Sequence, residues 1–215
     1  MKKLALAMLL CFSTMAYAQK EVTKFLGIPV DGSKPAMIEK LKAKGFKYNQ
    51  RLDYLTGEFN GNNVIIVIAT NNNKVWRIML VDKIAENETD IRIRFNHLIR
   101  QFKKNKKYTP AYIIDPTIDD SENISNEIIL RNKRYEATFF QKSTKGIKLE
   151  QEYEKYLETN SLSEEKANEL TKEMYATRES NSKRSVWFMI DRKYSDYRIY
   201  MFYDNEYNHS DGEDL

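Results

Sequence analysis

A helical pattern followed by strands with short asparagine-rich turns is the feature that most limits how this chain can fold. Met37, Ile38 and Leu41 lie at helical spacing after Ser33, a residue type that caps helices, and Gly45 closes the pattern. Strands are predicted at residues 54–59, 64–69 and 75–81, with turns at Asn60-Gly61-Asn62 and Asn71-Asn72-Asn73. Short turns join neighbouring strands in antiparallel fashion. The first part of the chain is therefore predicted to be one helix followed by an antiparallel meander.

The same plan starts again near Thr89 or Asp90, either of which can cap a longer helix. Its apolar stripe consists of Ile91, Phe95, Leu98, Ile99 and Phe102. Strands are predicted at residues 126–130, 135–141, 186–190 and 197–203. Residues 147–178 are rich in Glu, Lys and Leu, which predicts a helical pair inserted between strands. The predicted fold class is α+β, with two tandem α-β-β-β-type repeats at residues 19–84 and 85–215 and a helical insertion in the second.

The first 18 residues have the pattern of a cleaved signal peptide. Lys2 and Lys3 precede an apolar run from Leu4 to Phe12, and Ala16-Tyr17-Ala18 provides the small-x-small motif after which signal peptidase cuts. The mature chain is expected to begin at Gln19 and to be periplasmic or secreted.

Cys11, the only cysteine, lies inside this apolar run. Leu10 before it is not the small residue that a lipoprotein signal requires, so no lipid anchor is expected. Removal of the signal peptide leaves no thiol, and the mature protein must be stabilised by a core rather than by disulfides. No second apolar run approaches the roughly 20 residues of a transmembrane helix, so none is expected after signal removal.

Charge gives little support for a polyanion partner. Without Lys2 and Lys3, the chain has 33 basic residues against 31 acidic ones, a net charge of about +2. The second predicted helix has a basic face made of Arg92, Arg94, Arg100, Lys103, Lys104, Lys106 and Lys107. We interpret it as the solvated side of an amphipathic helix, because export separates the protein from nucleic acid. Anionic envelope glycan or lipid is the only polyanion partner left open.

The glycines near the first helix do not complete a phosphate-binding loop. Gly27 and Gly32 are followed by Ser33 and Lys34, whereas a phosphate loop has the lysine before the serine or threonine. Pro35 also removes one N–H donor of the first helical turn. We interpret residues 27–33 as a turn and a helix cap.

Metal-ligand patterns are also incomplete. His97 and His209 have no His or Cys neighbour at ligand spacing. Asp204, Glu206 and Asn208 alternate as in a calcium loop, but His209 stands where such a loop needs glycine. The sequence predicts neither a metal nor a cofactor.

The last two predicted strands are rich in aromatic residues. If helices cover one face of the sheet, alternation should leave several of these side chains on the other face. The candidate ligand-binding residues are Trp187, Tyr197, Tyr200 and Phe202, since exposed Trp and Tyr are common in protein-binding surfaces. The alternative is that strands simply favour aromatic residues and that the inserted helices pack over them. In the binding interpretation, the insert is a movable cover of the aromatic strands.

These features favour an exported, non-catalytic binding protein of the cell envelope whose partner is another envelope or extracellular protein. A carboxylate-dependent hydrolase acting on envelope or extracellular glycan is the alternative, because any two of the 31 acidic residues could meet in the fold.

Two resemblances accompany this interpretation. The segments FLGIPVDGSKPAMIEKLKAKGF, LTGEFNGNNVIIVIATNNNKVWRI, IRIRFNHLIRQFKKNKKY and YRIYMFYDNEYNHSDGEDL are similar to secreted proteins of unknown function from gut anaerobic bacteria. This resemblance spans most of the mature chain and implies no activity. The tandem units resemble the repeat architecture of the beta-lactamase inhibitor protein and of the SmpA/OmlA family, which implies inhibition or outer-membrane assembly. The helical insert and the missing lipobox depart from that architecture.

Overall fold

The computed structural model describes residues 21–159 and 163–209. The predicted signal peptide and its cut after Ala18 lie outside these residues. The described chain combines five helices with ten strands in antiparallel sheets, which confirms the α+β class.

The first unit follows the predicted order. A two-stranded hairpin of β1 (Lys24–Phe25) and β2 (Ile28–Pro29) precedes it. Ser33 is the N-cap of α2 (Lys34–Ala43), as predicted, although its side chain makes no capping hydrogen bond. The strands are β3 (Lys47–Asn49), β4 (Tyr54–Phe59), β5 (Asn62–Asn71) and β6 (Lys74–Asp82). The hairpin of β1 and β2 and the strand β3 were not predicted.

The second unit begins with α3 (Glu88–Lys104), whose N-cap is Asn87 rather than Thr89 or Asp90. Its strands are β7 (Tyr108–Pro110), β8 (Glu136–Gln141), β9 (Ser185–Lys193) and β10 (Asp196–Asp204). The helical insert forms α5 (Thr144–Thr159) and α6 (Glu164–Ser182), between β8 and β9 as predicted.

The strand predicted at residues 126–130 is wrong. These residues belong to α4 (Ile124–Arg131). The Asn123 side chain accepts a hydrogen bond from the Asn126 N–H, and the Glu88 carboxylate accepts one from the Ile124 N–H. Two otherwise unpaired N–H groups of the first turn are thereby satisfied, one of them by a residue of α3.

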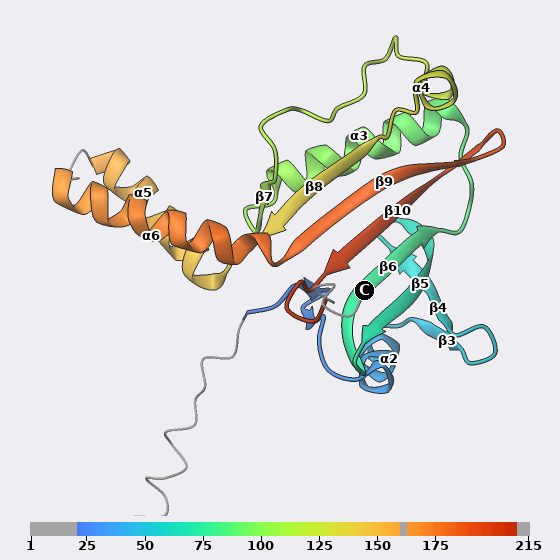
Figure 1. The fold of residues 1–215 in the computed structure, drawn as a ribbon, viewed down its shortest axis with the longest axis horizontal. Coiled ribbons are helices and arrows are strands. Elements are labelled where there is room, and N and C mark those ends of the chain that lie inside the picture. The colour runs from blue at the N-terminus through green and yellow to red at the C-terminus, as the bar shows by residue number, and fades with distance from the viewer. Residues whose placement is uncertain (1–20, 160–162, 210–215) are drawn as a thin grey trace, which may run out of the picture.

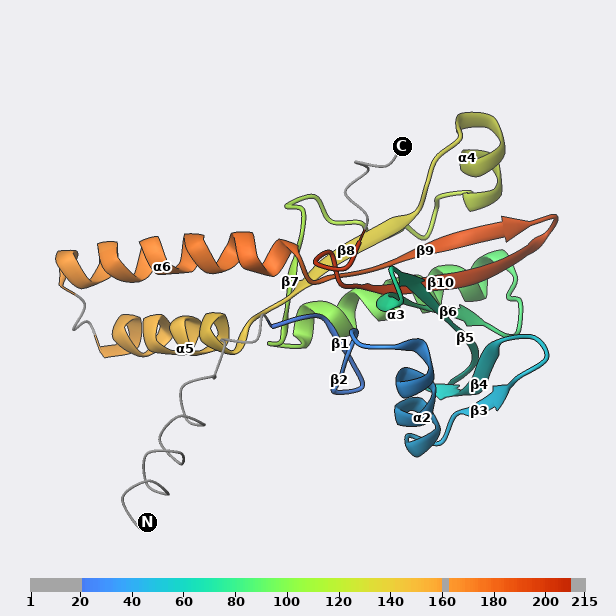
Figure 2. The ribbon, with the colours of Figure 1, turned by 60° about the horizontal axis from the view of Figure 1, so that its bottom comes forward.

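Eight strands form one antiparallel sheet in the order β3-β4-β5-β6-β10-β9-β8-β7. The last strand of each unit pairs with the other at the centre, where Met79 lies opposite Phe202 and Leu80 opposite Met201. The two units therefore share a single sheet. Figures 1 and 2 show this sheet with β6 and β10 side by side.

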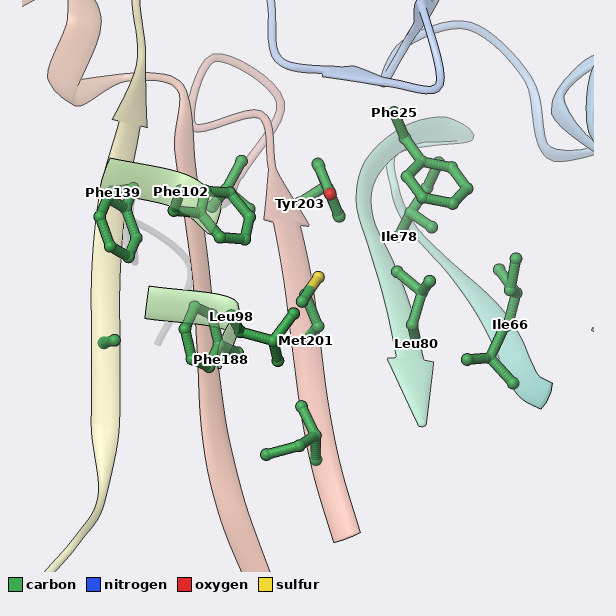
Figure 3. Packing of buried hydrophobic residues seen from close by; sticks show 14 of the residues in the cluster. Phe25, Ile66, Ile78, Leu80, Leu98, Phe102, Phe139, Phe188, Met201 and Tyr203 are labelled. Atoms are coloured by element: carbon green, nitrogen blue, oxygen red, sulfur yellow. The ribbon is translucent and has the colours of Figure 1, made fainter. Parts of the chain in front are cut away.

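The core lies on one face of the sheet, under α2 and α3. Met201 and Tyr203 of β10 lie between the core residues of the two units in Figure 3. One group consists of Leu98 and Phe102 of α3 with Phe139 and Phe188, and the other of Phe25, Ile66, Ile78 and Leu80. The Phe25 and Tyr203 rings, 4.9 Å apart, join the two groups at this seam.

The α5–α6 hairpin extends away from the sheet (Figures 1 and 2). It therefore does not act as the cover over the aromatic strands that the sequence left open. Among the described residues, no helix is both long and apolar enough to cross a membrane.

Candidate functional site on the second face of the sheet

The sheet face opposite α2 and α3 has a continuous apolar surface. Cross-strand register places five residues in one row, namely Val67, Met79, Phe202, Trp187 and Thr138. The adjacent row contains Ile65, Val81, Tyr200 and Met189. We refer to these nine residues as the open face. The side chains span β5, β6, β10, β9 and β8, and thus both units contribute to one surface.

Burial separates the two faces of the sheet. On the helix-covered face, Ile66, Ile78 and Phe188 are completely buried. On the open face, every residue except Phe202 is half-buried, the exposure expected of side chains that shield only one another. A contiguous apolar surface of half-buried side chains on one side of a sheet is typical of an interaction site.

An ion pair fixes the aromatic end of the open face. Asp204 accepts two hydrogen bonds of 2.6 Å from Arg77, and a third of 2.8 Å from the Trp187 indole N–H. The Trp187 and Phe202 rings stack with centroids 4.0 Å apart. The Arg77 guanidinium carbon lies 4.8 Å from the Phe202 centroid and 4.3 Å from that of Trp76. These contacts hold Arg77 and the two tryptophans in one arrangement, which reduces the entropy lost on binding.

The structure brings together three of the four residues predicted from the sequence. Trp187 and Tyr200 are half-buried on the open face, whereas Phe202 lies deeper, 7% exposed, beneath Trp187 and Arg77. Tyr197 does not join them. It is 3% exposed on the helix-covered face, where its hydroxyl donates a hydrogen bond of 3.4 Å to Glu88. Successive side chains of a strand point to opposite faces, and Tyr197 and Tyr200 are an odd number of positions apart, so they lie on different faces of the sheet.

Trp76, Arg77 and Asp204 were missed as site residues. The pairing of β5 with β6 shifts between Ala69 and Thr70, and Trp76 lies in this irregularity beside Arg77. A bulge changes which side chains share a face, and no residue type in the sequence marks this one. The only available signal was an arginine in one predicted strand and an aspartate directly after another, and 31 acidic residues made this signal unspecific.

The pKa shifts of the described carboxyl groups do not favour the acid pair of a glycosidase. Every shifted carboxyl pKa among them is lowered, and hydrogen bonds from Lys103 and Thr117 reduce the pKa of Asp115 to about 2. A general acid needs the opposite shift. The buried carboxylates Asp82 and Asp204 form bidentate ion pairs with arginine side chains instead. The hydrolase alternative therefore gains no specific support from the described residues.

Comparison of the chain with protein-family models, with curated proteins and with solved structures finds no match in any of the three. The resemblances described for the sequence stay predictions, and the function is inferred from geometry.

Proposed function

We propose that this protein is a non-catalytic binding protein that acts after export, in the periplasm or outside the cell, by holding another protein against its open face. The observation that carries the proposal is the apolar surface of both units, with its aromatic end fixed by Arg77 and Asp204. Trp, Tyr and Arg are the residue types most often found at the energetic centre of protein interfaces. Here Arg77 lies beside Trp187, and Tyr200 lies in the adjacent row of the same face.

A partner protein suits this surface better than a small molecule does. Small ligands bind in concave sites that enclose them. The open face is instead a sheet surface of five neighbouring strands, whose side chains offer apolar area with few hydrogen-bonding groups at the centre. Such a surface fits an apolar patch on another folded protein.

The test is a quantitative pull-down with the tagged mature chain as bait in the envelope and the medium of the producing cell. The variant Tyr200→Ser with Met189→Ser removes two half-buried side chains of the open face. Tyr175→Ser is the control, because Tyr175 is 68% exposed on α6 and away from this face. The proposal predicts one saturable protein partner. The amount of this partner recovered should fall at least about tenfold with the double variant and stay unchanged with the control. Equal recovery with both variants would contradict it.

A further inference from the structure

A cleft of about 1120 Å³ lies on the helix-covered side of the sheet, at the seam between the two units. One wall is the C-terminal part of α3, and the other is the segment around β1 with the β4–β5 turn. A reciprocal pair of side-chain hydrogen bonds between Asn60 and Gln101, of 2.8 and 3.3 Å, joins these walls. This volume is slightly larger than the about 300–1,000 Å³ that is usual for small-ligand sites, so the cleft has room for a small organic ligand.

Part of the cleft lining consists of buried apolar and aromatic residues. Met201 and Tyr203 of β10 line it at the seam, beside Leu98 and Phe102 of α3 (Figure 3). Leu26, 41% exposed, adds an apolar side chain from the β1–β2 turn. An apolar ligand segment could replace water along this lining and gain hydrophobic free energy.

Cations gather at one corner of the same cleft. Lys107 and Lys142 are neighbours through a backbone hydrogen bond of 2.8 Å, and the Gln141 N–H donates one of 2.9 Å to the carbonyl of Arg184. The Gln141 amide also bonds to the backbone of Lys24, by 2.7 and 3.0 Å. Four cationic residues of the lining therefore lie close together, because the chain ends of neighbouring strands meet here. They are Lys24 in β1, Lys107 just before β7, Lys142 just after β8 and Arg184 just before β9.

Several of these cations lack a carboxylate partner. Lys142 pairs with Glu150 and Arg184 with Glu21. Lys24 and Lys107, together with the nearby Lys104, form no ion pair with any carboxylate of the described chain, and all three are exposed. Glu21 and Glu58 are the acidic residues of the lining, so cations predominate there.

Arg184 supplies an additional donor. Arg184 is 2% exposed, and its buried Nε–H has no hydrogen-bond acceptor among the described residues. Burial lowers the pKa of its guanidinium, because the charged form loses hydration. A bound anion would lessen this cost by placing an opposite charge nearby.

We propose that the seam cleft binds a single-chain anionic amphiphile, with the acyl chain along the apolar lining and a carboxylate or phosphate head at the basic corner. Neither feature alone specifies this class of ligand. A free inorganic anion would leave the apolar lining wet, and an uncharged chain would leave the lysines unused. The cleft and the open face lie on opposite faces of the sheet, so this site is independent of the proposed protein partner.

Binding is measured by isothermal titration calorimetry on the mature protein, with ligands below their micelle concentrations. Dodecanoate and dodecyl phosphate test the two head groups, while dodecanol, acetate and inorganic phosphate test the chain and the charge separately. At least one of the two amphiphiles, dodecanoate or dodecyl phosphate, should bind with one molecule per chain. Its binding should be at least about tenfold tighter than that of dodecanol, acetate or inorganic phosphate. The tighter head group identifies the source of the anion. Equal binding of dodecanol, of acetate or of inorganic phosphate would overturn the proposal, as would no binding of either amphiphile.

Charge variants test the basic corner. Lys104→Glu with Lys107→Glu changes two exposed lysines of the lining that form no ion pair within the described chain, so the fold should be kept. We expect at least about tenfold weaker binding, or about 1.4 kcal/mol. Lys83→Glu with Lys193→Glu makes the same charge change on exposed residues outside the cleft. An equal loss of affinity with both pairs of substitutions would show that only the net charge attracts the ligand, and would contradict a binding site in the cleft.

Leu26→Asp tests the apolar lining. Leu26 has a φ of 51°, a backbone conformation that Asp accepts more readily than most residues, so the substitution should not disturb the turn. An acyl chain packed against the new carboxylate would remove part of its hydration, which should weaken binding about tenfold. Leu52→Asp, at a residue 58% exposed outside the cleft, is the control and should bind normally. Unchanged binding with Leu26→Asp would place the ligand elsewhere.

Discussion

At the scale of single residues, the pairing of Arg77 with Asp204 determines how firmly the open face is held. The Asp204 side chain is 3% exposed and that of Arg77 is 25% exposed. Arg77→Met should therefore leave a buried carboxylate unpaired and cost about 3 kcal/mol in the free energy of unfolding, the low end for a broken buried pair. Urea unfolding measures this loss. The double variant Arg77→Met with Asp204→Leu should regain part of it, and additive losses would argue against direct coupling.

Tyr203 makes a second residue-scale prediction, on the dependence of stability on pH. Burial raises its pKa well above the ordinary value, and a hydrogen bond with Tyr108 adds to the effect. The unfolded chain releases the phenol proton near pH 10, whereas the folded chain retains it. The contribution to stability is thus complete below about pH 10 and is lost as the pH rises above it, by at most about 1.4 kcal/mol per pH unit.

Urea unfolding at about pH 8 and about pH 11 tests this prediction. Tyr203→Phe should lose less stability between the two pH values than the unchanged chain does. Tyr194→Phe, at a residue 82% exposed in the β9–β10 hairpin, should behave like the unchanged chain. Equal alkaline loss in all three proteins would contradict the role of Tyr203.

At the scale of elements, Gly57 allows β4 to pack closely against the core residue Phe46. A Cβ at this position would lie 2.5 Å from Cδ1 of Phe46, a core residue 5% exposed. Gly57→Ala should therefore destabilise the fold by about 1–3 kcal/mol through overpacking. Adding Phe46→Leu should recover part of the loss if this contact is the cause. No change in the unfolding midpoint with Gly57→Ala would show that the ring moves freely.

The α5–α6 hairpin makes the second prediction at this scale. It extends from the sheet, and a Cβ at Gly146 would lie 3.8 Å from the Cβ of Thr177 across its base. A short Gly-Ser turn can therefore replace residues 147–176. The shortened chain should fold and keep the binding of the open face, as measured by circular dichroism and the pull-down. Loss of partner binding by a folded shortened chain would assign the partner to the hairpin instead.

Elements differed in how well the sequence predicted them. The strands β4, β5 and β6 follow from short runs of strand-favouring residues and from Asn-rich turns, both of which are local signals. The helix α4 was predicted as a strand, because Ile128, Ile129 and Leu130 favour strands. Its first turn depends on Glu88, 36 residues before Ile124, and such a partner cannot be read from neighbouring residues.

At the scale of the whole molecule, one sheet shared by two units explains both candidate sites. The pairing of β6 with β10 makes the open face continuous and also creates the seam above which the cleft lies. The sequence predicted two helix-and-sheet units but not which edges join, because edge pairing depends on tertiary contacts. For the same reason its candidate residues came only from β9 and β10, and Arg77 from the other unit, which contacts Trp187 and Phe202, was missed.

The central claim is that the open face binds a partner protein, and site-specific photo-crosslinking tests it most directly. A photoreactive phenylalanine analogue replaces Tyr200 or, as the control, Tyr175. Both proteins are made in the producing cell, and its cell envelope and medium are irradiated. We predict one saturable protein adduct at position 200 and none of the same mass at position 175. No adduct at position 200, or the same adducts at both positions, would contradict the account.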